Sequence, residues 1–186
     1  FVIQLSFLFS LLKKLYTKKQ LLYWEALLKK AYVFIQKTRQ YITKEKENEV
    51  GKLIKEQNCQ KVLIHYGGSS AKKSGLIDKV KKSLEEENIN YIELGGVVPN
   101  PVLSLVYEGI ELCKKENVDF ILAVGGGSVI DSSKAIGYGV TNEGDVWDFY
   151  DYKRVPTSCL PIGVILTIAA AGSEMSNSSV ITKDDN

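Results

Sequence analysis

The chain has 186 residues and a formal net charge of +2, with 45% hydrophobic and 25% charged residues. This length fits one ordinary α/β domain and is too short for a two-domain enzyme of the usual size. The composition is that of a globular protein, which excludes a disordered, collagen-like or disulfide-rich chain. The cysteines (Cys59, Cys113 and Cys159) are odd in number and form no C-x-x-C pair. We therefore expect neither a disulfide framework nor a zinc knuckle, and we expect a cytoplasmic protein.

Residues 1–46 differ in charge from the rest of the chain. They hold ten Lys or Arg residues against two Glu, whereas residues 47–186 hold fourteen against twenty acidic residues. The opening run FVIQLSFLFSLL is too short to span a bilayer and lacks the flanks of a secretory signal. Leucines at positions 5, 8, 12 and 15 predict a basic amphipathic helical extension over 1–46. Such a helix could lie on a membrane, but we favour packing against protein and expect no nucleic-acid partner.

From Glu47 onward, apolar runs alternate with helical patterns. The runs are short and mostly closed by glycine, as expected for buried strands, and they predict strands at 61–66, 90–94, 119–124 and 160–166. A first helix, capped by Ser74, has its apolar face at Ile77, Val80 and Leu84. A second helix is predicted to begin at Asn100-Pro101, and a third, VIDSSKAIG, to end at Gly137 and Gly139. The alternation predicts an α/β fold with a mostly parallel sheet and helices on both faces.

Glycine-rich turns follow the first three predicted strands, at residues 67–70, 95–101 and 125–128. Ligands of parallel sheets bind beyond the carboxyl ends of the strands. Glycine lets backbone N–H groups approach a phosphate closely, and the start of a following helix adds unpaired donors and its positive dipole end. Any one of these turns is explained equally well by a tight reversal of the chain. Three at one edge favour a nucleotide, with its pyrophosphate at the third turn.

The third turn differs from two familiar phosphate-binding motifs. A G-x-G-x-x-G pattern beginning at Gly125 would need glycine where Ile130 stands, and no Walker lysine motif occurs. The chain has G-G-G-S-x-x-D-x-x-K, which places Asp131 and Lys134 on one helical face. The two residues either form a surface ion pair or bring a carboxylate within reach of the sugar or ring end of a dinucleotide.

Four segments in this order carry a resemblance to a known family: VLIHYGGSSAKKSGL, VVPNP, DFILAVGGGSVIDSSKAIG and TIAAAGSEMSNSSVIT. Residues 47–186 resemble the nucleotide-binding half of the iron-dependent (group III) alcohol dehydrogenases, and within that family the NAD(P)H-dependent butanol dehydrogenases. The resemblance implies a dehydroquinate-synthase-like dinucleotide-binding domain, followed in the family by a helical domain that carries the metal. It implies an oxidoreductase that reduces aldehydes to primary alcohols with NADH or NADPH and is a homodimer when intact.

The resemblance also assigns roles to single positions. The turn at 67–70 would face the adenosine ribose, Asn100-Pro101 would flank the adenine, 125–128 would hold the pyrophosphate, and Asp131 would lie toward the nicotinamide. Four later residues would border the coenzyme from the other side. The expected cofactor-binding residues are Gly67, Gly68, Ser69, Ser70, Asn100, Pro101, Gly125, Gly126, Gly127, Ser128, Asp131, Thr167, Ile168, Ser173 and Ser176.

The chain also departs from the family. Ser69 and Ala171 replace a glycine and a threonine of the family's turns, and the family's opening strand is not recognisable before Glu47. The family binds divalent iron or zinc through one aspartate and three histidines of the helical domain, whereas this chain has one histidine. We expect His65 to be a buried strand residue and Cys159 to be buried. We therefore expect no metal site and no catalytic residue here, and a truncated chain that is inactive alone.

Two functions of other classes stay open at this point: a stand-alone nucleotide-binding module, and a protein that acts on membranes or nucleic acid through its basic amino-terminal helix. The choice of coenzyme also stays open, because the turn at 67–70 contains neither an acidic residue nor an arginine. Lys72 and Lys73 favour a 2′-phosphate only weakly.

Overall fold

The structure, a computed structural model, describes residues 46–168 and 172–184. The chain divides between Tyr41 and Ile42 into two units, and every described residue belongs to the second. The helical extension predicted over residues 1–46 lies, apart from Lys46, outside the described residues. Within the described ranges, no helix has both the length and the apolar character needed to cross a membrane.

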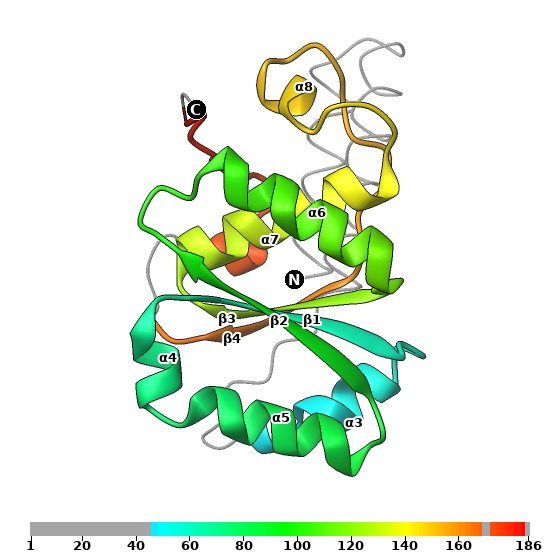
Figure 1. Ribbon diagram of the computed structural model, residues 1–186, viewed down its shortest axis with the longest axis vertical. Coiled ribbons are helices and arrows are strands. Elements are labelled where there is room, and N and C mark those ends of the chain that lie inside the picture. The colour runs from blue at the N-terminus through cyan, green and yellow to red at the C-terminus, as the bar shows by residue number, and fades with distance from the viewer. Residues whose placement is uncertain (1–45, 169–171, 185–186) are drawn as a thin grey trace, which may run out of the picture. The chain divides into compact units, whose positions relative to one another are not determined.

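A four-stranded parallel sheet forms the centre of the described unit (Figure 1). Its strands are β1 (Lys61–Gly67), β2 (Asn90–Val97), β3 (Phe120–Gly125) and β4 (Ile162–Leu166). The order across the sheet is β2-β1-β3-β4, so the chain moves outward from β1 to β2 and then returns to the other side of β1. This reversal makes the boundary between β1 and β3 a topological switch point, where open α/β sheets bind ligands. The predicted α/β fold and its parallel sheet are confirmed.

Helices cover both faces of the sheet, as predicted (Figure 1). One face carries η1 (Lys46–Glu49), α3 (Val50–Lys55), α4 (Ser69–Lys73) and α5 (Leu76–Glu86). The other face carries α6 (Leu103–Glu116) and α7 (Gly127–Thr141), with α8 (Trp147–Tyr150) after α7 and η2 (Ser173–Met175) after β4. The short elements η1, α3, α4, α8 and η2 are absent from the predicted set.

The strands bury their side chains alternately on the two faces. In β1, Val62 and Ile64 belong to the core cluster shared with α3 and α5, whereas Leu63 belongs to the cluster shared with α6 and α7. All three side chains are fully buried. A strand covered on both faces has an uninterrupted apolar sequence rather than an alternating one, which is why KVLIHY was recognisable as a strand.

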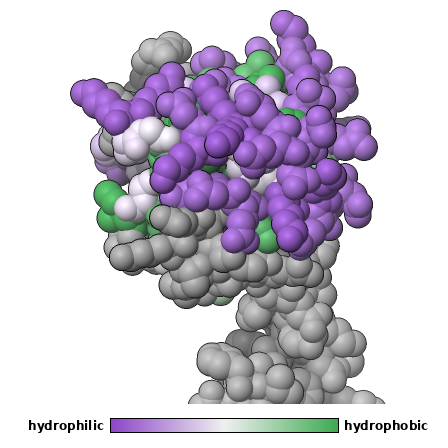
Figure 2. All heavy atoms as spheres, turned by 90° about the horizontal axis from the view of Figure 1, so that it is seen from below, coloured by the Kyte–Doolittle hydropathy of each residue, from purple (hydrophilic) through white to green (hydrophobic). Residues whose placement is uncertain are grey.

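The amphipathic pattern predicted for α5 is confirmed. Ile77, Val80 and Leu84 are almost completely buried in the core beside the sheet. The opposite side of the helix is charged, and Lys79 forms an ion pair with Glu47 at 3.2 Å. Figure 2, which views the molecule from this side, shows mostly hydrophilic side chains over the described unit. The helix therefore separates the core from solvent.

The predicted start of α6 at Asn100-Pro101 is wrong by two residues. Asn100 has a left-handed conformation with φ of 57°, and the helix begins at Leu103. The reason is a contact that is remote in sequence: Val102 forms a parallel bridge with Thr182, and the Leu103 amide donates to the Thr182 carbonyl at 2.9 Å. Backbone from the end of the described chain therefore fixes where this helix starts.

Other helix caps also differ from the predicted ones. The Ser104 amide of α6 donates to the Asp184 carboxylate at 3.0 Å, so a distant aspartate caps this helix. Ser74 does not cap α5, because its hydroxyl donates to the Ala71 carbonyl at 3.0 Å and the residue before the helix is Gly75, with φ of 74°.

Gly137 and Gly139 do not end α7 as predicted, since the helix continues to Thr141. Both glycines lie where the helix approaches its neighbours. A Cβ atom on Gly139 would lie 2.2 Å from Cδ1 of Ile110, and one on Gly137 would lie 2.6 Å from the sulfur of Cys159. These two glycines therefore serve close packing rather than helix termination.

Candidate nucleotide-binding site

The predicted glycine turns lie at the carboxyl ends of β1, β2 and β3, at one edge of the sheet. The second prediction is corrected in one respect, since β2 continues to Val97 and Gly95 and Gly96 lie within the strand rather than after it. Gly67 at the end of β1 pairs with Val97 of β2, and Gly125 at the end of β3 pairs with Leu166 of β4. Directly after β4, the Thr167 amide donates to the Gly125 carbonyl at 3.1 Å. The turns after β1 and β3 thus stand on either side of the switch point, where a ligand is expected.

Three glycines at this edge have no role among the described residues that requires glycine. A Cβ atom placed on Gly68, Gly126 or Gly127 would meet no heavy atom of the described residues within 4 Å. None of the three has a positive φ, so their backbone conformations are open to any residue. Side chains there would project into free space, which is the space that a ligand approaching the backbone would need.

The start of α7 presents backbone donors to this space. Gly126 precedes the helix, and the Val129 amide is bonded to its carbonyl at 3.1 Å. The amides of Gly127 and Ser128 come earlier in the first turn, where a helix provides no acceptor, and no side chain in the described ranges bonds to them. α7 has 15 residues, and its positive dipole end lies here. This arrangement suits a phosphate group.

The other glycines of these turns have reasons within the protein. A Cβ atom on Gly125 would lie 2.5 Å from Cγ2 of Val129, and one on Gly95 would lie 2.4 Å from the ring of Tyr66. Gly96 has a φ of 95°, which side-chain-bearing residues rarely adopt. These glycines serve packing and backbone conformation, so they carry no information about a ligand.

Further predicted contact residues flank the open glycines. The backbone of Ser69 and Ser70 begins α4 directly after Gly68. Thr167 and Ile168 follow β4 beside the third turn, and Ile168 is largely exposed. The structure therefore brings the residues predicted at the ends of β1, β3 and β4 to one edge.

The other predicted contact residues differ in exposure and in whether the protein itself already uses their polar groups. Asn100 is exposed in the loop between β2 and α6, whereas Pro101 is buried and its carbonyl accepts the Thr182 amide at 2.8 Å. The hydroxyl of Ser176 accepts the Ser178 amide at 2.9 Å. Pro101 and Ser176 thus have clear roles in the local chain conformation.

Asp131 and Lys134 hold the segment that follows Gly172. Lys134 is buried, and its Nζ donates to the carbonyls of Ser173 and Ser178, both at 2.7 Å. Asp131 accepts the Ser173 hydroxyl at 2.5 Å and the Val180 amide at 3.2 Å. Burial lowers the pKa of Lys134, opposed by the charge of Asp131, whose Oδ1 is 3.9 Å from Nζ. The predicted alternative of an ion pair between the two residues is thus present, but it is mostly buried rather than at the surface, and both oxygens of Asp131 are used by the protein itself.

Neither His65 nor Cys159 is placed as a ligand or a nucleophile. His65 is fully buried in β1, as expected, with one ring nitrogen 2.8 Å from the Leu94 carbonyl and the other 2.8 Å from the Ser132 hydroxyl. The expected burial of Cys159 is wrong, since the residue is exposed in the loop before β4. Its sulfur nevertheless lies against α7, and desolvation there raises the pKa of the thiol to about 12. A reactive thiolate is therefore disfavoured at neutral pH.

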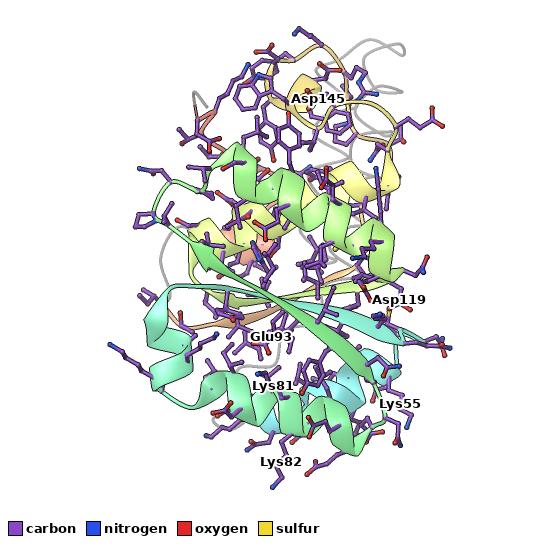
Figure 3. All side chains as sticks on the ribbon, in the orientation of Figure 1. Lys55, Lys81, Lys82, Glu93, Asp119 and Asp145 are labelled. Carbon is purple, nitrogen blue, oxygen red and sulfur yellow. The ribbon has the colours of Figure 1, made fainter. Side chains whose placement is uncertain are left out.

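Glu93 is an acidic residue close to the glycine turns, but it faces α5. Its carboxylate lies 2.6 Å from Nζ of Lys81 and accepts the Tyr66 hydroxyl at 3.2 Å. Figure 3 shows Glu93 on β2 and Lys81 on α5 reaching toward each other. This carboxylate is engaged within the protein and is not presented at the edge.

Sequence reasoning missed Ser132 altogether, and it named Lys134 only as a neighbour of Asp131 without its role in holding the segment after Gly172. Ser132, Ser133 and Lys134 are all buried within the otherwise apolar run of α7. Buried polar groups need partners. The signal was therefore available as three adjacent polar residues at inward positions, although nothing in the sequence named their partners.

No metal site is assembled in the part of the chain that the structure describes. No group of three or more His, Cys, Asp or Glu side chains there could hold an ion. Both nitrogens of the one histidine are bonded to protein groups. The residues present do not fit an iron ion, and no step of the chemistry proposed below depends on one.

Known proteins share this fold and sequence. The crystal structure of NADH-dependent butanol dehydrogenase A from Thermotoga maritima has a TM-score of 0.74 and 46% sequence identity, covering 75% of this chain and 35% of that one. The family model of iron-containing alcohol dehydrogenase matches residues 37–186. The chain belongs to the iron-containing alcohol dehydrogenase family.

Two curated relatives are similar over part of their length. The probable NADH-dependent butanol dehydrogenase 1 of Bacillus subtilis is 52% identical over 121 residues, which cover 65% of this chain and 31% of the relative. NADH-dependent butanol dehydrogenase A of Clostridium acetobutylicum is 46% identical over 145 residues, covering 78% and 37%. The chain thus spans about a third of the length of these relatives.

Proposed function

We propose that this chain supplies the coenzyme-binding half of an NADH-dependent oxidoreductase that interconverts aldehydes and primary alcohols. The observation that carries the proposal is the open space at Gly68, Gly126 and Gly127, in front of the first amides of α7. Neither packing against the described residues nor backbone conformation requires glycine there, whereas a ligand lying against the backbone does. The names of the similar proteins support NADH as the coenzyme and butanol as a model substrate.

The proposed contacts follow the order of the turns. The backbone at 67–70 would face the adenosine ribose, and Asn100 with Pro101 would border the adenine. Residues 125–128 would bind the diphosphate through the amides at the start of α7. Thr167, Ile168, Ser173 and Ser176 would border the coenzyme from the side of β4. Asp131 would act at the nicotinamide end by holding the segment 173–180, because its own oxygens are already bonded.

The chain's part in catalysis is to bind and orient. When bound, the nicotinamide supplies a hydride to the substrate carbonyl, or takes one up from the alcohol. Donors at Gly127 and Ser128 would offset the diphosphate charge without rearrangement, because the helix fixes them beforehand. We assign no acid, base or nucleophile to this chain, and we propose that it does not reduce aldehydes by itself.

Binding of NADH to the full 186-residue chain tests the proposal. In isothermal titration calorimetry we expect saturable binding of NADH and of ADP-ribose, which shares the adenosine diphosphate. Gly126→Ala and Gly127→Ala should each raise the Kd for NADH at least about tenfold, because the added methyl occupies the space of the diphosphate. Lys82→Ala, on the exposed side of α5, is the control and should leave the Kd unchanged.

Two results would contradict this proposal: no saturable NADH binding by the unmodified chain, or one and the same Kd in all three variants. Tighter binding of NADPH than of NADH would support the proposed site but contradict NADH as the coenzyme.

We also propose a cytoplasmic location, supported by the three cysteines, all of which are free thiols. The homodimer of the intact enzyme stays a prediction, which light scattering of a full-length relative and of this chain would check.

A further inference from the structure

The buried imidazole of His65, near the carboxyl end of β1, bonds to one neighbouring strand and to one helix. The His65 side chain is 0% exposed. Its Nδ1 lies 2.8 Å from the carbonyl of Leu94 on β2, and its Nε2 lies 2.8 Å from the hydroxyl of Ser132 on α7. A single side chain on β1 therefore links a strand on one side of the switch point to a helix on the other.

The partners define the protonation state of this ring. The Leu94 carbonyl can only accept, so Nδ1 must carry the proton and Nε2 must accept the Ser132 hydroxyl proton. Burial lowers the pKa of His65 to about 4, although the bond to Leu94 opposes this. The ring is therefore neutral at physiological pH, in its Nδ1–H form, with both nitrogens satisfied.

The bonds of His65 end next to the glycine turns. His65 stands two residues before Gly67, and Leu94 directly precedes a bulge in β2 where Gly95 and Gly96 lie opposite the single residue Tyr66. A bulge changes the direction of a strand and re-aims the chain that follows it. The bond to Leu94 thus fixes β2 at the His65–Leu94 pair, the last regular pair before the bulge. Beyond the bulge, the chain continues into the loop that contains Asn100 and Pro101.

The other bond of the ring holds α7. Ser132 lies in this helix five residues after Gly127, which is part of the proposed diphosphate site at 125–128. A shift of α7 along the sheet would move the amides of Gly127 and Ser128. The hydroxyl of Ser132, fixed on His65, opposes such a shift from inside the core.

We propose that His65 is a positioning residue for coenzyme binding: as the neutral Nδ1–H tautomer it fixes the β2 bulge and the start of α7 relative to each other, so that the glycine turns are pre-arranged around the diphosphate. This inference rests on the proposed function. Sites that are arranged before binding lose less free energy on ordering when the ligand arrives. Loosening the link should weaken coenzyme binding without removing any contact to the coenzyme.

The chain offers a matched pair of variants for this test. Ser132→Ala removes the bond to Nε2 and leaves His65 in place. Ser133→Ala removes an equally buried hydroxyl that donates to the Val129 carbonyl of its own helix at 2.8 Å and does not touch His65. Both are small changes at neighbouring positions of α7, so both variants should fold, as thermal unfolding would verify.

Calorimetric titration of NADH compares the two variants. We expect Ser132→Ala to raise the Kd about fivefold, corresponding to one hydrogen bond, and Ser133→Ala to leave it unchanged. Equal Kd values for the two variants, with normal binding by the unmodified chain, would overturn this inference alone. Absence of binding by the unmodified chain would overturn the proposed function and this inference with it.

A second readout does not depend on coenzyme. The chain has one histidine, so selective ¹⁵N labelling of histidine gives the NMR signals of a single ring. We expect the neutral Nδ1–H tautomer from pH 8 down to about pH 5.5, and a changed Nε2 signal in Ser132→Ala but not in Ser133→Ala. A cationic ring near pH 6, or a proton on Nε2, would overturn the assignment.

Discussion

Glycines in two regions of this molecule have opposite physical reasons. At the contact between α3 and α5, a Cβ atom on Gly51 would lie 2.0 Å from the Ser83 carbonyl oxygen. At the carboxyl edge of the sheet, a Cβ atom on Gly126 would meet nothing described within 4 Å. The first glycine lets two backbones come into contact, whereas the second leaves space that no described residue fills. Only glycines of the second kind point to a ligand.

The comparison predicts its largest effect at Gly51. Gly51→Ala forces the backbones of α3 and α5 apart and disturbs the bond from the Gly51 amide to the Ser83 hydroxyl, at 3.0 Å. We expect a loss of about 3 kcal/mol or more in the free energy of unfolding, measured by urea denaturation. The Kd for NADH of the folded fraction should not change. If Gly51→Ala were as stable as the unmodified chain, glycine would not be required for the contact between α3 and α5.

The next effect is a pH dependence of the free energy of unfolding, and it comes from His65, which is buried in β1 two residues before Gly67. Its pKa is about 4 in the folded chain against 6.5 ordinarily. Below pH 6.5 the unfolded chain therefore binds a proton that the folded chain does not, so stability falls as pH falls and levels off below pH 4. Between pH 7 and 5 the unmodified chain should lose about 2 kcal/mol more than His65→Asn, which cannot titrate. Equal losses in urea denaturation would show that His65 is not buried in its neutral form.

A similar or smaller effect is expected at Lys134, which fastens the segment bordering the site. Lys134→Met keeps the length of the side chain but leaves the carbonyls of Ser173 and Ser178 without their donor. We expect a loss of about 2 kcal/mol and faster proteolysis within residues 173–180. Lys79→Met, at an exposed ion pair with Glu47, is the control and should cost less than about 0.5 kcal/mol. Similar losses in both variants would contradict the role of Lys134.

The smallest effect on stability belongs to the open edge. Gly126→Ala adds a methyl group where nothing is contacted and where φ is −98°, so the free energy of unfolding should change by less than about 0.5 kcal/mol. Thermal unfolding would check this. A normal melting temperature, together with the expected loss of NADH binding, would support the difference between Gly126 and Gly51. A large loss of stability in Gly126→Ala would contradict it.

Sequence reasoning predicted the sheet because its signal is local. β1 and β3 are covered on both faces, so each is a continuous apolar run that ends at glycine. The α/β alternation then leaves few possible topologies. The glycine turns could be placed at one edge for the same reason, since the carboxyl ends of parallel strands coincide.

The parts that sequence reasoning missed depend on contacts between distant residues. The start of α6 is decided by Thr182 rather than by Asn100, whose amide looked like a cap. Gly137 does not end α7, because glycine is needed there to make room for the sulfur of Cys159. Local propensity is a weak guide wherever tertiary packing competes with it, and neither partner could be identified from the neighbouring residues.

The candidate site was predictable by position but not by role. The glycines at 125–127 look alike in sequence, yet Gly125 is needed for Val129 while the next two are open. Asp131 matched a motif, but its partners, Ser173 and Val180, show a structural role. Distinguishing such roles requires the surroundings of each residue, which only the folded chain supplies.

The pairing of Val102 with Thr182 has a consequence for the order of folding. The neighbouring bond from Ser104 to Asp184 joins residues 80 apart in sequence, enclosing β3, α7 and β4 within the loop. Closing so long a loop has a high entropic cost unless those elements have already condensed. In native-state hydrogen exchange, the amides of Leu103 and Thr182 should therefore exchange at similar rates, and faster than those of β1. This result would show that the pairing opens as one unit while the sheet stays folded.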